Sequence, residues 1–156
     1  MKRTRVLFVC TYQGARARIA EEYVKQIAPG KIEAFSACFD PGKITPLPID
    51  VMREVGITIS AESPESVFKL YRDGEVFDYV ITLCFDATTE PCHLFNKNVE
   101  TLYSKNAEII SWSIPNFKSL MGTEEEKKAE ARLIRDEIKS EVILFLERIG
   151  IDAEIE

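Results

Sequence analysis

The segment VLFVCTYQGAR, residues 6–16, decides the fold of this chain. Its first four residues are apolar, with a β-branched valine at each end, which is typical of a strand buried on both faces. Cys10 ends that run, and a short loop with one glycine follows. From Arg16 onward, apolar residues recur at helical spacing (Ile19, Ala20, Tyr23, Val24 and Ile27). We therefore predict a strand, a tight loop and a helix in immediate succession.

This strand–loop–helix segment predicts a binding site for an anion. The first N–H groups of a helix have no partner within the helix, and the helix dipole favours negative charge there. A cysteine at such a position, next to a guanidinium group, can have a thiol pKa well below its usual value. Arg16 can hold two oxygens of one oxyanion. The alternative is that Cys10 is an inert, buried cysteine at the end of a strand.

The composition limits the classes of function. With 156 residues, the chain is expected to form one domain over residues 1–156. Its net charge of −6 argues against a general nucleic-acid or membrane surface, so an anion needs a local pocket. No apolar stretch has the length of a signal peptide or a membrane span. We expect a cytoplasmic protein whose four cysteines are reduced or redox-active rather than structural.

Strands and helices are predicted to alternate along the chain. We expect strands at residues 6–9, 31–37, 79–84 and 108–112, with a further candidate at 99–103. The last helix begins at a capping box, Thr123 to Glu126, and continues to Gly150. This alternation indicates an α/β domain with a parallel sheet, in which ligands bind beyond the carboxyl ends of the strands. Cys10 and Cys84 both end a predicted strand, which places them at the same edge.

A resemblance to a known family rests on the C-x5-R loop and on several later segments. These segments are residues 6–16, 20–21, 35–37, Pro46, 52–57, 59–60, 80–84, 112–116 and the long final helix. Together they resemble the low-molecular-weight protein tyrosine phosphatase superfamily, and within it the thioredoxin-coupled arsenate reductases. The resemblance implies a three-layer α/β/α fold with a central four-stranded parallel sheet and the C-x5-R loop after the first strand.

The resemblance also implies roles for the residues of this loop. Cys10 is expected to be the nucleophile, and Arg16 the residue that binds the anion and stabilises the transition state. The substrate is a small oxyanion, arsenate or phosphate, or a phosphotyrosine. The residues implied in substrate binding are Thr11, Tyr12, Gln13, Gly14, Ala15 and Arg16.

Two further cysteines distinguish the branches of the superfamily. In the reductases, a second and a third cysteine carry the electrons, and Cys84 and Cys92 occupy those places with a spacing one residue longer. By resemblance, Cys10 attacks arsenate, Cys84 attacks the adduct and releases arsenite, and Cys92 forms a disulfide with Cys84. Thioredoxin is the implied external reductant, and no bound cofactor is expected. Taken singly, Cys84 can also be a buried strand end and Cys92 an exposed loop thiol.

Several residues depart from the family pattern, and these departures leave two alternative functions open. Asn116 stands where the family has the aspartate that acts as general acid, and neither Asp86 nor Asp136 lies in the expected loop. Ala17 replaces a serine that stabilises the thiolate. The alternatives are therefore a phosphatase that uses a Cys10 phosphoenzyme, or a weakened homologue that binds oxyanions or senses redox state.

No metal is expected at either of two candidate places. Glu21 and Ser36 match a cation site of some relatives, but Gln13 departs from that site. A zinc site built from Cys84, Cys92 and His93 lacks a convincing fourth ligand.

Overall fold

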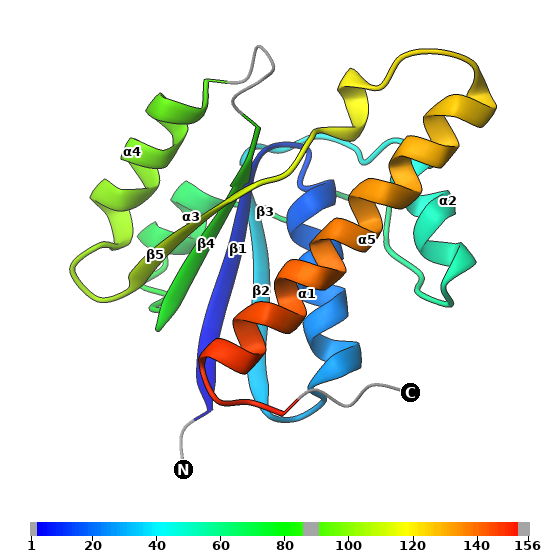
Figure 1. Ribbon diagram of the computed structural model, residues 1–156. Helices are drawn as coiled ribbons and strands as arrows, with labels where there is room; N and C mark the ends of the chain where they lie inside the picture. Colours follow the sequence, from blue (N-terminus) through cyan, green and yellow to red (C-terminus); the bar gives the residue numbers. More distant parts are fainter. Residues whose placement is uncertain (1–2, 86–90, 153–156) are drawn as a thin grey trace.

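The computed structural model describes residues 3–85 and 91–152. A five-stranded parallel sheet forms its centre, in the order β3-β2-β1-β4-β5 (Figure 1). The strands are β1 (Thr4–Tyr12), β2 (Ile32–Asp40), β3 (Glu65–Ser66), β4 (Tyr79–Cys84) and β5 (Glu108–Ser113). The helices are α1 (Ala15–Ile27), α2 (Pro46–Glu54), α3 (Val67–Arg72), α4 (Cys92–Tyr103), the 3-10 helix η1 (Phe117–Ser119) and α5 (Glu124–Arg148).

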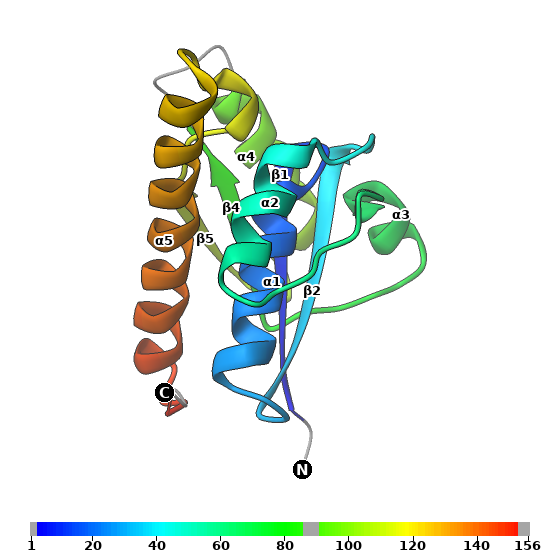
Figure 2. The ribbon, with the colours of Figure 1, turned by 90° about the vertical axis from the view of Figure 1, so that its right-hand side faces the viewer.

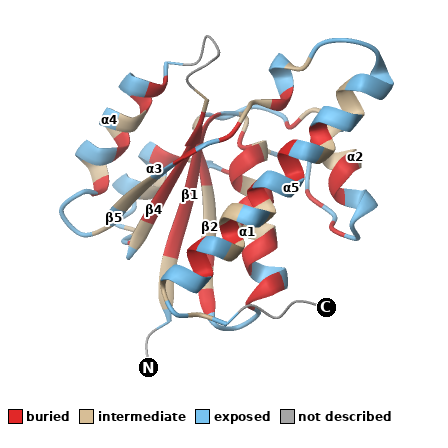
Figure 3. Cartoon of the chain, viewed as in Figure 1, coloured by how far each residue is buried: buried red, intermediate tan, exposed pale blue. Residues whose placement is uncertain are grey.

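Helices cover both faces of the sheet and give the molecule three layers. Helices α1, α2 and α5 lie on one face and α3 and α4 on the other (Figures 1 and 2). Strand β1 supplies both apolar cores: Val6 and Phe8 pack on the α1 side, and Leu7 and Val9 pack on the α4 side. All four side chains are fully buried, and Figure 3 shows β1 as a buried strand at the centre. The prediction of a strand buried on both faces is confirmed.

The predicted α/β class and the parallel sheet are confirmed, with two differences in detail. A fifth strand is present because Glu65 and Ser66 pair with Ala37 and Cys38 at the edge of β2. The candidate strand at 99–103 is wrong, since these residues belong to α4. The buried side chains of α4 (Cys92, Phe95, Val99 and Tyr103) recur every three or four residues, so its apolar face fits a helix.

The last helix begins where its sequence predicts. The hydroxyl of Thr123 accepts a hydrogen bond from the N–H of Glu126 (3.1 Å), and the Glu126 carboxylate accepts one from the N–H of Thr123 (3.0 Å). This capping box starts α5, which packs along α1 through its buried residues Ala131, Ile134, Ile138, Val142, Phe145 and Leu146. None of the helices in the described ranges has an apolar stretch long enough to cross a membrane.

Candidate active site

Strand β1 extends past Cys10 into the C-x5-R segment. Cys10 pairs in register with Cys38 of β2 and Leu83 of β4, and Tyr12 still pairs with Asp40. The Cys10 side chain is fully buried, and its Sγ lies 4.0 Å from the backbone oxygen of Tyr12. The strand therefore includes the first half of the motif, beyond the cysteine at which the sequence predicted it to end.

The turn between β1 and α1 consists of Gln13 and Gly14. Both have left-handed backbone conformations, with φ of 57° and 85°. The N–H of Gln13 donates to the backbone oxygen of Asp40 (3.1 Å), and the N–H of Gly14 donates to that of Tyr12 (2.5 Å). Helix α1 then begins at Ala15. Two of the amides expected to bind an oxyanion thus donate to protein oxygens in this structure.

Gly14 is required by its backbone conformation and by the neighbouring chain. A Cβ atom at this position would lie 2.2 Å from Cδ of Pro64 and 2.3 Å from its Cγ. Pro64 also accepts a weak hydrogen bond through its backbone oxygen from Sγ of Cys38 (3.5 Å). Burial, with a further contribution from Cys10, raises the pKa of the Cys38 thiol to about 12. Cys38 is therefore a neutral thiol in the packing around the turn.

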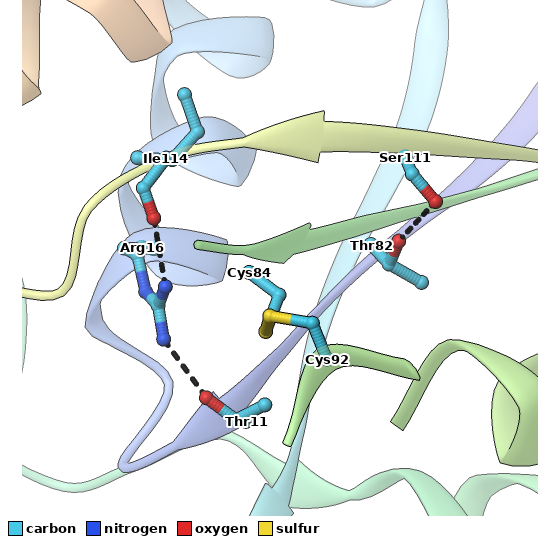
Figure 4. The surroundings of a disulfide bond; sticks show 7 residues. All are labelled: Thr11, Arg16, Thr82, Cys84, Cys92, Ser111 and Ile114. Atoms are coloured by element: carbon cyan, nitrogen blue, oxygen red, sulfur yellow. Dashed lines mark hydrogen bonds between the residues drawn. A yellow bond between two sulfur atoms is a disulfide. The ribbon is translucent and has the colours of Figure 1, made fainter. Parts of the chain in front are cut away.

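Arg16 lies inside the protein at the carboxyl end of the sheet, with only 2% of its surface exposed. Its Nη1 donates to the backbone oxygen of Ile114 (2.9 Å), and its Nη2 donates to Oγ1 of Thr11 (2.9 Å; Figure 4). Thr11 is itself 2% exposed. Its hydroxyl and the Ile114 carbonyl fix the orientation of the guanidinium group.

A disulfide joins Cys84 and Cys92 next to this arginine (Figure 4). Cys84 is the last residue of β4, and Cys92 is the first residue of α4. The two cysteines are 6% and 3% exposed, and their Cα atoms lie 5.8 Å apart. The backbone oxygen of Cys84 accepts a hydrogen bond from the N–H of Ile114 (3.1 Å). One residue, Ile114, therefore contacts both the disulfide cysteine and Arg16 through its backbone.

Asn116 lies two residues after Ile114, in the loop that follows β5. Its Oδ1 accepts a hydrogen bond from the N–H of Lys118 (3.1 Å) and so caps the 3-10 helix η1. Asp136 is remote from this loop: it lies on α5 and binds Arg135. Asp86 lies outside the described residues.

The other residues near the carboxyl end of the sheet differ in their exposure. Tyr12 is 38% exposed, whereas Ala17 is fully buried in α1. Trp112 packs on Phe8, with ring centroids 5.7 Å apart. His93 is exposed in the first turn of α4.

Glu21 and Ser36 bind each other and two basic side chains. The Ser36 hydroxyl donates to Glu21 (2.5 Å), Lys25 binds the other carboxylate oxygen of Glu21 (2.6 Å), and Arg18 donates to Ser36 (3.2 Å). Within residues 3–85 and 91–152, no three His, Cys, Asp or Glu residues gather into a group that could hold a metal ion.

The family model of the low molecular weight phosphotyrosine protein phosphatases matches residues 5–154. The chain belongs to this family. The match covers the strand–turn–helix segment, both disulfide cysteines and the long final helix.

Among the relatives of this phosphatase-family chain are proteins named as arsenate reductases. The arsenate reductase of Halalkalibacterium halodurans is 28% identical over 150 residues, which cover 94% of this chain and 98% of the relative. The structure of an arsenate reductase in its oxidised state has a TM-score of 0.71 at 23% identity, covering 94% of this chain and 99% of that one. A thioredoxin-dependent arsenate reductase from Corynebacterium glutamicum has a TM-score of 0.61 at 22% identity, covering 94% and 62%. These solved structures share the fold.

Two residues of the site gave no signal in the sequence. Ile114 contributes only backbone atoms, and any residue type except proline can donate and accept at such a place. Pro64 acts by the position of its ring against Gly14, which depends on how two distant segments pack. The C-x5-R motif includes their partners, Arg16 and Gly14, but gives no indication of Ile114 or Pro64.

Proposed function

We propose that this protein reduces arsenate to arsenite through Cys10, Cys84 and Cys92. The observation that carries the proposal is the Cys84–Cys92 disulfide, joined through Ile114 to the buried Arg16 of the C-x5-R segment. A phosphatase reaction of this family needs only one cysteine, that of the loop. Two thiols that can join into a disulfide at the same edge supply the two electrons that a reduction requires.

The proposed cycle uses only thiols and balances its electrons. The Cys10 thiolate attacks arsenic, and a hydroxide leaves as water after it takes up a proton. The Cys84 thiolate then attacks Sγ of Cys10, so that the sulfur–arsenic bond breaks, two electrons remain on arsenic and arsenite departs. The Cys92 thiolate attacks Sγ of Cys84, which forms the Cys84–Cys92 disulfide and releases the Cys10 thiolate.

An external dithiol must restore the two thiols after each turnover. We propose thioredoxin for this step, which is supported by the thioredoxin-dependent relative from Corynebacterium glutamicum. The cycle needs reduced cysteines at its start, and this requirement suits the cytoplasm. Arg16 would bind the arsenate oxygens and oppose their negative charge in the transition state.

The test measures arsenite formed from arsenate in the presence of thioredoxin, thioredoxin reductase and NADPH. We expect Cys84→Ser and Cys92→Ser to abolish multiple turnover while phosphate binding remains. Cys38→Ala is the matched control, because Cys38 is also buried but lies outside the relay, and this variant should keep its turnover. Absence of arsenite, with Cys84 and Cys92 still reduced by mass spectrometry, would overturn the proposal.

Family membership supports a second candidate function, that of a phosphatase that works through a Cys10 phosphoenzyme. Its requirements differ from those of the reductase, because Cys84 and Cys92 would be dispensable for phosphate release from an aryl phosphate. The same two serine variants therefore separate the two reactions. If the wild type makes arsenite and the serine variants lose this activity but keep their phosphatase turnover, the reductase is supported. If the wild type makes no arsenite and the serine variants keep its phosphatase turnover, the phosphatase is supported.

A further inference from the structure

Arg16 and the disulfide are connected by an unbroken series of hydrogen bonds. The Cys84 carbonyl accepts from the N–H of Ile114 (3.1 Å), and the Ile114 carbonyl accepts from Nη1 of Arg16 (2.9 Å). On its other side, Nη2 of Arg16 donates to Thr11 (2.9 Å; Figure 4). The redox centre and the anion-binding arginine are thus separated by the backbone of one residue.

The turn that follows β1, Gln13 and Gly14, has a conformation that does not suit an anion. Strand β1 continues to Tyr12, and the N–H groups of Gln13 and Gly14 donate to backbone oxygens of Asp40 and Tyr12. An oxyanion at Arg16 would have to take those donors from their present acceptors. A hydrogen bond to a charged acceptor contributes about 1.5–3 kcal/mol, so two missing donors lower the affinity by more than tenfold.

We propose that the disulfide form is a closed state of the oxyanion site, held by Thr11 and Ile114 on Arg16, and that reduction of Cys84–Cys92 opens it. The inference deepens the proposed function and rests on it. In the disulfide form, Cys84 is tied to the first residue of α4, which fixes the backbone that Ile114 contacts. Thr11 is a positioning residue, because it acts on the anion only through Arg16.

The closed state has a consequence for the cycle. After the disulfide has formed, Cys84 and Cys92 have no thiol with which to attack Sγ of Cys10 in a new arsenic adduct. A weak oxyanion site at that stage prevents arsenate from occupying a protein that cannot reduce it. Because linkage is reciprocal, an oxyanion that prefers the reduced form also favours reduction of the disulfide.

The experiment titrates inorganic phosphate into two forms of the full chain by calorimetry. One form carries the Cys84–Cys92 disulfide, verified by peptide mapping. The other is treated with dithiothreitol, which gives up two electrons and two protons to open the bond and becomes a cyclic disulfide. We expect the reduced form to bind phosphate at least tenfold more tightly. Saturating phosphate should then raise the reduction potential of the disulfide by about 30 mV for each tenfold difference.

Three variants test the role of Thr11. Thr11→Val removes the acceptor of Arg16 and should bring the phosphate affinity of the disulfide form close to that of the reduced form. Thr11→Ser keeps the hydroxyl and should restore the wild-type difference. Thr82→Val is the matched control, because Thr82 is fully buried near the same disulfide but its hydroxyl binds Ser111 (2.9 Å; Figure 4).

The possible outcomes separate this inference from the proposed function. If neither form binds phosphate, the anion site itself is wrong and the proposed function fails with it. If both forms bind phosphate equally, only the closed state is overturned. If Thr11→Val and Thr82→Val change both forms by the same factor, Thr11 has a structural role alone and the assignment of Thr11 is overturned.

Discussion

Gly14 occupies a place in the turn that tolerates no side chain. We expect Gly14→Ala to lower the free energy of unfolding by about 3 kcal/mol, because it adds a steric clash to the cost of a left-handed backbone. The new Cβ would lie 2.2 Å from Pro64, in a segment that also contacts Cys38. Urea denaturation measures the loss. Phosphate affinity should fall as well, since the clash displaces the turn.

Gly30→Ala is the control for this substitution. Gly30 also has a positive φ, 74°, but a Cβ atom there meets no other atom within 4 Å. The control should lose only the backbone contribution of about 1 kcal/mol. Equal losses in the two variants would show that the contact of Gly14 with Pro64 contributes nothing.

Asn116 gives a second prediction, which concerns phosphatase chemistry. We expect Asn116→Asp to raise kcat for an aryl phosphate at least tenfold, because a general acid typically contributes about a hundredfold or more. Aspartate caps a helix as well as asparagine does, so the bond to the N–H of Lys118 should survive. Asn116→Ser is the control, because serine also caps but cannot act as the acid. If the two variants have the same kcat, position 116 is not the place of the acid.

The sequence identified the side chains of the site better than its backbone. Cys10 and Arg16 follow from a motif, Cys84 from a strand end, and Cys92 only from the family resemblance. The structure joins Cys84 and Cys92 in one disulfide beside Arg16. The conformation of the turn could not be predicted. Whether the N–H of Gln13 meets an anion or the backbone of Asp40 depends on a balance of tertiary contacts and redox state, which no residue type encodes.

Helices α2 and α5 are joined by one acidic and two basic side chains. Glu54 of α2 binds Arg132 through both carboxylate oxygens (2.9 Å each) and binds Arg135 (3.1 Å). Hydrogen bonds and charge from Arg132 and Arg135 lower the pKa of Glu54 to about 2. Because the folded pKa lies below the ordinary value of 4.5, the stabilisation is complete at higher pH and is lost as the pH falls from about 4.5 through 2.

This linkage predicts how Glu54→Gln changes the pH dependence of stability. The variant should be less stable than the wild type at pH 7, and the difference should shrink as the pH approaches 2. Urea unfolding of both proteins between pH 2 and pH 7 measures this difference in stability. Glu124→Gln is the control, because the Glu124 side chain is 92% exposed, 3.9 Å from Lys127. A constant difference for Glu54→Gln across this range would contradict the prediction.

Elements with strong local signals were predicted well, and short or ambiguous ones were not. The capping box of α5 and the apolar face of α1 are patterns of neighbouring residues, so the sequence alone predicts these two helices. Residues 99–103 have apolar positions that suit a strand or a helix, and packing against β4 and β5 decides between them. Strand β3 has two residues and exists only through its pairing with β2, so no local pattern predicts it.

The order of the strands places the whole site at one edge of the molecule. Strands β1 and β4 are neighbours, so Arg16, which follows β1, and Cys84, which ends β4, meet at their common carboxyl end. Strand β5 lies next to β4 and delivers Ile114 to the same edge. A parallel sheet thus brings Arg16, Cys84 and Ile114 together from three segments that are distant in the sequence, and α4 adds Cys92.

The disulfide should also determine the stability of the whole molecule. It closes a short loop, with eight residues of sequence separation, and the loss of chain entropy in the unfolded state then stabilises the fold by about 2.5 kcal/mol. For a chain of this size, reduction should lower the melting temperature by roughly 5–10 °C. Thermal unfolding of the two forms, followed by circular dichroism, measures the difference. A double variant with serine at both positions should melt like the reduced form with or without dithiothreitol.

Phosphate should stabilise the reduced form more than the disulfide form, if the disulfide form is the closed state. A ligand at one hundred times its Kd adds about 2.7 kcal/mol to the form that binds it. Phosphate at that excess over the Kd of the reduced form should therefore restore most of the stability lost on reduction. It should raise the melting temperature of the disulfide form much less, because Arg16, Gln13 and Gly14 are bound to protein oxygens there. Equal shifts in both forms would show that oxyanion binding and the disulfide are independent, and the short path through Ile114 would then transmit no coupling.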